Sequence, residues 1–310
     1  MARQGPACAG GWKRFHLKIV AANAPVSWGV MEVDGFSQHI SPAAFLDELT
    51  SAGYTGTELG PYGYLPTDAE SLRRELDSRS LTLMSAFVPL RLKDPGADLE
   101  TVRQTGKLLA ALGAQHIVLA DAMWPEREAA AGRVPECAYH LKLEDWSTVA
   151  ANIARAMELA APLELRSVFH HHAGTYIETP DEIAHLLDLT PIGLCLDTGH
   201  FVLGGGDPVD AVRQYGARVE YLHFKDVDAA RLADCRKREL GFLDAVRAGV
   251  FCPLGKGCVR FPELLTELDK IGYNGWAVVE QDVDLNAGAA LSPLESAIAS
   301  RRFLRDTLGI

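Results

Sequence analysis

Several features that mark particular classes of protein are missing from this sequence. Its 310 residues contain no run of basic residues, and its formal net charge of -11 repels phosphate backbones and anionic lipid surfaces. No segment approaches the roughly 18 consecutive apolar residues of a membrane-spanning helix, and residues 1–15 lack the apolar core of a secretory signal. The sequence therefore predicts a soluble, cytoplasmic protein that binds neither nucleic acid nor membranes.

Paired cysteines are missing as well. The cysteines form no CxxC pair and no zinc-finger spacing, and they are scattered along the chain as Cys8, Cys137, Cys195, Cys235, Cys252 and Cys258. This scatter predicts reduced thiols. Cys195 lies in the apolar run "IGLCLD" and is expected to be a small core residue. Nothing beside Cys252 or Cys258 would lower a thiol pKa, so we expect no functional thiol there.

What the sequence does contain is a regular alternation of strands and helices. Short apolar runs typical of β-strands alternate with longer stretches of helical spacing along the whole chain. The predicted strands cover residues 17–23, 55–59, 81–87, 115–121, 164–170, 192–197, 219–225 and 276–281. Strands that alternate with helices form a parallel sheet, and eight such strands close a barrel. The predicted fold is a single (β/α)8 TIM barrel of the α/β class.

The chain is predicted to hold one domain, because no Gly-rich linker or shift in composition divides it. We assign residues 1–14 to an N-terminal extension and residues 15–310 to the barrel. A helix over residues 293–308 is expected to complete the outer ring. A doubly wound sheet is the alternative fold, but no Gly-rich phosphate-binding fingerprint follows any of the predicted strands.

Ionisable residues gather at one end of the predicted strands. The active site of a TIM barrel lies at the carboxyl ends of its strands. That is where the sequence has Glu58, His170 to His172, Asp197, His223 with Lys225, and Glu280. The stretch "FHHHAGT" puts three histidines in succession. Because side chains alternate along a strand, His170 and His172 share one face while His171 takes the other.

Four of these residues form a predicted metal site, namely His170, Asp197, His223 and Glu280. Two imidazoles and two carboxylates suit Mn²⁺, Co²⁺, Mg²⁺ or Zn²⁺ and leave positions for substrate oxygens. Each residue alone has an ordinary structural explanation, such as a helix cap for Asp197 or a hydrogen-bonded core residue for His223. Their occurrence together favours the metal site. Either His170 or His172 could be the ligand from strand five, since both share a face.

Two loops at the same end of the barrel are candidates for substrate binding. The stretch "NAPVSWG", residues 23–29, follows strand one and could pack under a sugar-sized ligand, although Trp28 could equally be a core residue. The stretch "GPYGYLP", residues 60–66, follows strand two. It could cap a small polar substrate or be an ordinary surface loop.

Six motifs, spread in order over nearly the whole chain, resemble one family. They are "NAPVSWGV", "GYTGTELGPYGYLP", "FHHHAGT", "CLDTGH", "YLHFKDV" and "WAVVEQD". Together they are similar to the xylose isomerase-like TIM barrels, and within that family most similar to the inosose dehydratases and the related sugar isomerases and epimerases. The resemblance implies a divalent metal, with Mn²⁺ first among the candidates. Asp197, His223 and Glu280 match the family's Asp, His and Glu ligands.

The end of strand five departs from part of this family. Many of the epimerases have Glu where this sequence has His170. A two-base epimerase removes a proton with one carboxylate and returns it from the opposite side with another, so the histidine removes that symmetric pair. The "HHHAGT" form resembles the inosose dehydratases and favours elimination.

The resemblance also implies the chemistry, which is proton abstraction beside a metal-polarised carbonyl. Glu280 is the first choice as general base. Lys225 and His172 are candidates to hold or protonate the departing hydroxyl. Glu58 is a candidate to bind ring hydroxyls, as a catalytic or a substrate-binding group. The further candidates for substrate binding are His200, Asn23 and Trp28. Either His172 or His200 could serve as acid or base. The expected function is a metal-dependent hydro-lyase that dehydrates a keto-cyclitol or keto-sugar.

Three other functions are weighed against this one. A metal-dependent isomerase or epimerase acting on a ketose or keto-glycoside is the nearest alternative, and a homo-oligomer is compatible with either. A non-catalytic sugar-binding barrel or an inactive subunit belongs to another class, and the apparently intact ligand set argues against it. Repair enzymes of the endonuclease IV type share the barrel, but the acidic charge argues against DNA.

Overall fold

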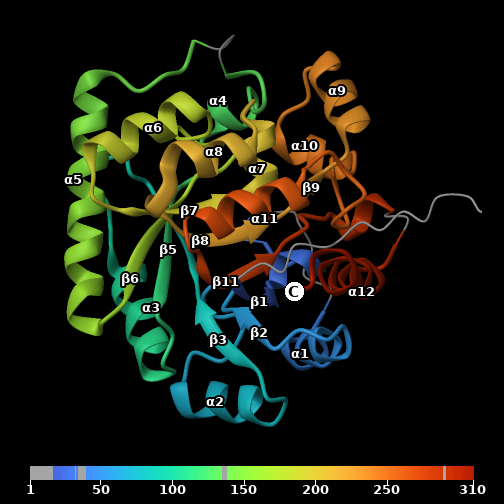
Figure 1. The fold of residues 1–310 in the computed structure, drawn as a ribbon. Coiled ribbons are helices and arrows are strands. Elements are labelled where there is room, and N and C mark those ends of the chain that lie inside the picture. Colours follow the sequence, from blue (N-terminus) through green and yellow to red (C-terminus); the bar gives the residue numbers. More distant parts are fainter. Residues whose placement is uncertain (1–16, 32, 34–39, 135–137, 289–290) are drawn as a thin grey trace, which may run out of the picture.

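The strands stand at the centre of the molecule with helices around them (Figure 1). The computed structural model describes residues 17–31, 33, 40–134, 138–288 and 291–310. The N-terminal extension predicted over residues 1–14 lies outside the described residues, as do Cys8 and Cys137. The assignment of residues 15–310 to one domain stays a prediction.

One parallel sheet forms the barrel. Its segments are arranged in the order β3-β2-β1-β11-β8-β7-β6-β5-β4, and all their pairings are parallel. The segments are β1 (Lys18–Asn23), β2 (Gly56–Glu58), β3 (Thr82–Ser85), β4 (Phe87–Leu90), β5 (His116–Asp121), β6 (Arg166–His170), β7 (Gly193–Asp197), β8 (Val219–Phe224) and β11 (Asn274–Val279).

The segments β3 and β4 are two halves of one strand. Only Ala86 separates them, and its carbonyl oxygen accepts a hydrogen bond from the backbone N–H of Val118 in β5. Because β3 pairs with β2 while β4 pairs with β5, this one strand joins the two ends of the sheet. The sheet is therefore a barrel of eight strands, and the predicted (β/α)8 fold is confirmed.

Two strand boundaries differ from the prediction in ways that matter for the site. The third strand continues past Phe87 to Leu90, so that Phe87 lies within the barrel wall. The eighth strand ends at Val279, so Glu280 follows the strand. The backbone N–H of Glu280 still donates to the carbonyl oxygen of Phe224, and this bond fixes its position at the rim.

Helices cover the outside of the barrel (Figure 1). They include α1 (Pro42–Ser51), α2 (Ala69–Asp77), α3 (Glu100–Ala111), α5 (Leu143–Ala160), α6 (Pro180–Leu189), α8 (Pro208–Tyr215), α11 (Phe261–Lys270) and α12 (Pro293–Phe303). The predicted last helix is α12 continued by a π-helical turn over Leu304–Leu308. Helix α12 begins with a capping box of Ser292 and Glu295, which satisfies backbone N–H groups at its start. Within the described residues, no helix combines the length and apolar character needed to cross a membrane.

Further elements lie in the loops that follow β5, β7 and β8. They are α4 (Pro125–Glu128), α7 (Thr198–Leu203), α9 (Ala229–Lys237), α10 (Phe242–Arg247) and the short antiparallel pair β9 (Asp226–Val227) and β10 (Phe251–Cys252). Apolar side chains of α9, α10 and β10 form a small core of their own, separate from the main one. This small core fixes the shape of the long connection that follows β8.

The interior of the barrel explains where the site lies. Its apolar layer is made of Ala22, Ala24, Met84, Val118, Val168, Cys195, Tyr221 and Val278. Four of these, on β6, β7, β8 and β11, each stand two residues before one of the predicted metal ligands. Alternation along a strand puts residues two apart on the same face. The predicted ligands therefore form the next inward layer, at the carboxyl ends of the strands.

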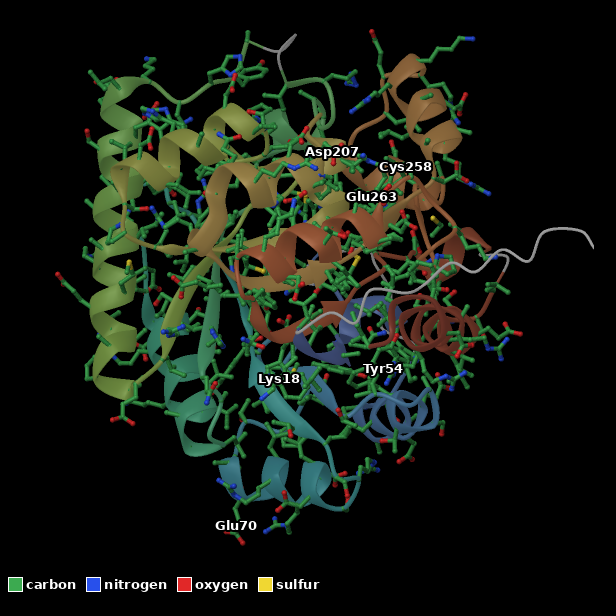
Figure 2. All side chains as sticks on the ribbon, viewed as in Figure 1. Lys18, Tyr54, Glu70, Asp207, Cys258 and Glu263 are labelled. Atoms are coloured by element: carbon green, nitrogen blue, oxygen red, sulfur yellow. The ribbon has the colours of Figure 1, made fainter. Side chains whose placement is uncertain are left out.

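The cysteines behave as ordinary thiols. The four described ones are free, and Cys195 is buried in the barrel interior as expected. Burial raises the pKa of the Cys252 thiol to about 12. Cys258 is exposed (Figure 2), and partial burial of its thiol still raises its pKa. Neither thiol has the lowered pKa of a reactive cysteine.

Candidate active site

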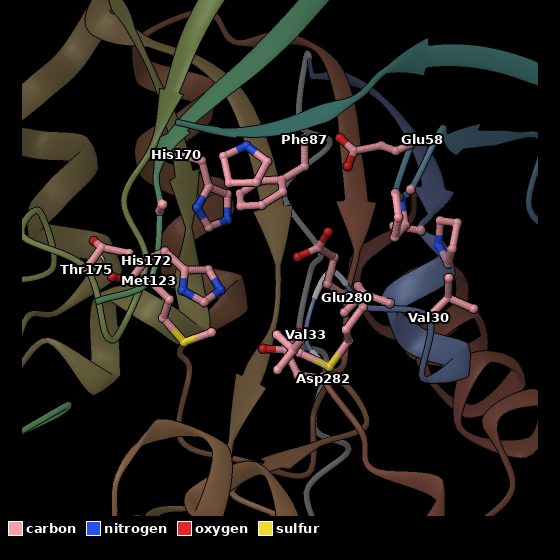
Figure 3. A pocket seen from close by; sticks show the side chains of 18 of the residues that line it. Val30, Val33, Glu58, Phe87, Met123, His170, His172, Thr175, Glu280 and Asp282 are labelled. Atoms are coloured by element: carbon pink, nitrogen blue, oxygen red, sulfur yellow. Dashed lines mark hydrogen bonds between the residues drawn. The ribbon is translucent and has the colours of Figure 1, made fainter. Parts of the chain in front are cut away.

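Four buried side chains converge at the barrel rim. They are His170, Asp197, His223 and Glu280, and their ligand atoms all lie within 4.8 Å of one another. We call them the metal group. The Nε2 atom of His170 lies 3.5 Å from Oδ2 of Asp197, and Nδ1 of His223 lies 3.2 Å from Oε2 of Glu280. Figure 3 shows His170 and Glu280 pointing into the pocket.

The metal group fits a divalent cation. Asp197 Oδ2 and His223 Nδ1 are buried and have no hydrogen-bond partner among the described residues. Burial lowers the pKa of His170, which keeps its imidazole neutral with a free lone pair. Burial raises the pKa of Asp197, but Lys225, His200 and His170 together lower it well below its usual value, so the carboxylate stays ionised. Two imidazoles and two carboxylates at this spacing are a ligand set for a transition metal.

Asp197 has two functions in this structure. Its Oδ1 accepts hydrogen bonds of 2.8 Å from the backbone N–H groups of Gly199 and His200, which caps α7. Its Oδ2 turns toward the metal group. The helix-cap and ligand interpretations of this residue are therefore compatible, because each uses a different oxygen.

Glu58 lies behind His223. Its Oε1 is 3.0 Å from Nε2 of His223 and accepts a 2.6 Å hydrogen bond from the hydroxyl of Ser85. Burial lowers the pKa of His223, but Cys195, Glu280 and Glu58 together raise it well above its usual value. A carboxylate behind an imidazole orients the ring and fixes which nitrogen carries the proton. Glu58 also lines the pocket, so its position serves both His223 and the cavity.

A second group of side chains, two buried and one partly buried, adjoins the metal group. It consists of His172, His200 and Asp282, whose ligand atoms also lie within 4.8 Å of one another. We call it the second group. The sequence could not decide between His170 and His172 as the ligand from strand five. In the structure His170 belongs to the metal group and His172 to the second group. His171 takes the opposite face, where its Nε2 accepts a hydrogen bond from the backbone N–H of Asp197.

Lys225 connects the two groups. Its Nζ lies 2.8 Å from Oδ1 of Asp282 and 3.0 Å from Nε2 of His200. On the other side it lies 3.1 Å from Oε2 of Glu280 and 3.4 Å from Oδ2 of Asp197. Sequence reasoning missed Asp282. Its only signal was the spacing of two residues from Glu280 in "EQD".

A pocket of about 280 Å³ opens over these groups. Its polar wall contains Glu58, Asp121, His170, His172, Lys225, Glu280 and Asp282. Its apolar wall includes Pro25, Val30, Met31, Pro61, Phe87, Met123 and Phe242. Phe242 of α10 packs edge-on against His172, with ring centroids 5.0 Å apart. The pocket suits a ligand with a hydroxylated face and a less polar face.

The remaining predicted substrate-binding residues lie elsewhere. The structure places Trp28 in the core, where its ring packs against Phe45 and its indole N–H donates to Glu48. Asn23 is fully buried, and its Oδ1 accepts a hydrogen bond from the backbone N–H of Ala24. Neither residue lines the pocket. Instead the loop after strand one contributes Pro25, Val26 and Val30, because its 3-10 turn over Pro25–Trp28 points the indole inward.

The loop that carries His172 is held by a buried carboxylate. Glu178 accepts hydrogen bonds from the backbone N–H groups of Gly132 and Gly174 at 2.6 and 2.8 Å. Burial raises the pKa of Glu178 to about 7. Beside it, Arg127 forms a two-pronged ion pair with Glu182. These contacts tie the loop after β6 to the long loop after β5.

Comparison with known proteins agrees with the fold. The model of the xylose isomerase-like TIM barrel family matches residues 46–307. The chain belongs to this family.

Among curated proteins, the chain is 34% identical over 280 residues to the rhizopine catabolism protein MocC of Rhizobium meliloti, covering 89% of this chain and 85% of that protein. It is 32% identical over 273 residues to the inosose dehydratase of Geobacillus kaustophilus, covering 84% and 86%. The solved structure of the IolI protein with a bound zinc atom superimposes with a TM-score of 0.70 at 14% identity, covering 93% of this chain and 97% of that one. At that identity the likeness shows the fold alone.

Proposed function

We propose that this enzyme is a Mn²⁺-dependent hydro-lyase that removes water from a keto-cyclitol or a keto-sugar. The observation that carries the proposal is the contact between Lys225 and Glu280 of the metal group, whose Nζ and Oε2 atoms lie 3.1 Å apart. Elimination of water needs a base for a C–H proton and an acid for a departing hydroxyl. A ring bound against this contact would have the base and the acid on the same side.

The two residues divide the chemistry. Glu280 takes the proton from the carbon beside the carbonyl, and Lys225 gives a proton to the hydroxyl on the next carbon, which leaves as water while a C=C bond forms. The proton that Glu280 gains returns to Lys225 across their 3.1 Å contact, so the pair ends the cycle as it began. A divalent metal bound by the metal group would polarise the substrate carbonyl and make the adjacent C–H more acidic.

Other residues hold the substrate. His172 donates its Nδ1 proton to the carbonyl oxygen of Ala173 at 2.7 Å, which leaves Nε2 as a hydrogen-bond acceptor for a ring hydroxyl. Phe242 covers this imidazole and excludes water from that part of the site. Lys225 is the only Lys or Arg side chain lining the described pocket, and it already contacts three carboxylates. The pocket therefore favours a neutral polyol over a phosphorylated sugar.

The relatives support the same class of reaction. An inosose dehydratase is 32% identical over 84% of this chain, which is enough to carry its reaction here as a proposal. The position of His170 supports elimination over two-base epimerisation, because the side chain facing Glu280 in the metal group is an imidazole.

The test is an assay of products. Mn²⁺-loaded protein is incubated with a panel of inososes, ketohexoses and 3-keto-glycosides, and absorbance of a conjugated enone is followed together with a chromatographic profile of the sugars. A hydro-lyase gives the enone band. A changed sugar profile without that band would instead identify an isomerase or epimerase, and no change with any substrate would favour a sugar-binding barrel.

A further inference from the structure

The second group has the composition of a metal site, yet it already holds a cation. Two imidazoles and a carboxylate are common ligands of divalent ions. Here their ligand atoms lie within 4.8 Å of one another, with His200 and Asp282 buried and His172 partly buried. Oδ2 of Asp282 is buried and has no hydrogen-bond partner among the described residues. The ammonium group of Lys225 lies against Oδ1 of the same carboxylate and against Nε2 of His200.

The residues around Lys225 hold its side chain against Asp282 and His200. Its side chain is 1% exposed. Its backbone N–H donates to the hydroxyl of Thr198, which in turn donates to the carbonyl oxygen of Lys225. A Cβ atom at Gly199 would lie 2.6 Å from Cγ of Lys225, so only glycine at that position leaves room for the lysine side chain. Residues of α7 thus shape a slot for one aliphatic chain.

Charge balance points the same way. Three carboxylates contact Lys225, namely Asp197, Glu280 and Asp282. One divalent ion in the metal group and one ammonium group supply the three positive charges that these carboxylates require. With the ammonium group of Lys225 in place, a second divalent ion would leave an excess of positive charge beside these carboxylates, which is unfavourable in a buried site.

We propose that Lys225 is the resident cation of the second group, so that the chain binds one divalent ion where its ligands would otherwise hold two. In two-metal sites the second ion stabilises an oxygen that leaves or attacks. Lys225 occupies that place and can also supply a proton, which a metal ion cannot do. This last role rests on the proposed function, whereas the binding of a single ion does not.

The experiment counts metal ions without any substrate. Wild-type protein and variants are stripped with a chelator, saturated with Mn²⁺, desalted and analysed for metal per chain, with circular dichroism as the check on folding. The wild type is expected to bind one ion. Lys225→Ala and Lys225→Ser are expected to bind two, because the second group is then open. Electron paramagnetic resonance should show an isolated ion in the wild type and a coupled pair in the variants.

A double variant provides the control. Lys225→Ala combined with Asp282→Asn is expected to return to one ion, since the second group has lost its carboxylate. Two ions in the wild type would overturn the proposal, and so would one ion in folded Lys225→Ala and Lys225→Ser proteins. A failed enone assay with one ion in the wild type and two in Lys225→Ala would contradict the proposed function and leave this inference standing.

Discussion

The two sides of the barrel mouth differ in chemistry. The side formed by β6, β7, β8 and β11 supplies the metal group, which is buried and ionisable. The side formed by β1, β2, β4, β5 and the loops after them supplies mainly proline and apolar side chains, including Pro25, Pro61, Phe87 and Met123. The reacting groups therefore lie on the first side of the barrel mouth, and the second side gives the cavity its shape. Changes on the first side should lower kcat, and changes on the second should raise KM.

The largest effect is expected at Glu280. Glu280→Gln keeps the shape of the side chain and removes the base, so kcat should fall by about 10³-fold. The measurement is the steady-state rate with saturating Mn²⁺. Glu263→Gln is the matched control, because Glu263 is exposed on α11 (Figure 2) and does not line the pocket. A Glu280→Gln protein with nearly full activity would show that the base lies elsewhere.

A smaller effect is expected at Glu58, which supports the ionisable side from across the barrel. Glu58→Gln weakens the carboxylate behind His223, and the affinity for Mn²⁺ should fall about 10- to 100-fold. Isothermal titration measures the dissociation constant. Ser85→Ala removes only the donor to Glu58 and should give a weaker effect in the same direction. Unchanged affinity in both variants would separate Glu58 from the metal site.

On the apolar side of the pocket, shortening a side chain should weaken substrate binding. Met123→Ala removes a wall of the pocket, and KM should rise about tenfold while kcat changes little. Full kinetic curves at several substrate concentrations distinguish the two constants. Leu143→Ala serves as a control because that leucine is 82% exposed. A fall in kcat alone for Met123→Ala would contradict the division between the two sides.

The smallest effect is expected at Glu178, which joins the loop after β5 to the loop after β6. Because burial raises the pKa of Glu178 to about 7, the folded state favours its protonated form. Its contribution to stability is therefore fully present below the unfolded pKa of about 4.5 and is lost as pH rises through about 7. Glu178→Gln should lower the thermal midpoint overall and flatten its decline between pH 5 and 8. An unchanged pH dependence would mean that Glu178 does not titrate in that range.

The sequence predicts the barrel well because its signals are local. Alternating apolar runs define the strands, and the period of two places His170 and His172 on a different face from His171. The same period places Asp197, His223 and Glu280 one layer above Cys195, Tyr221 and Val278 in the barrel.

Contacts between distant strands could not be predicted from the sequence. The choice between His170 and His172 depends on where the neighbouring strands end, and the contact of Glu58 with His223 crosses the barrel. Asp282 lies three residues past the end of β11 at Val279, and the predicted strand, which ends at residue 281, does not include it. Trp28 could not be assigned because the direction of its side chain is set by a 3-10 turn.

The most direct measurement for the central claim is anomalous diffraction from crystals of the Mn²⁺-loaded protein. The account predicts one strong peak, bounded by His170 Nε2, Asp197 Oδ2, His223 Nδ1 and Glu280 Oε2. A peak bound by other residues, or no peak at full Mn²⁺ saturation, would contradict it.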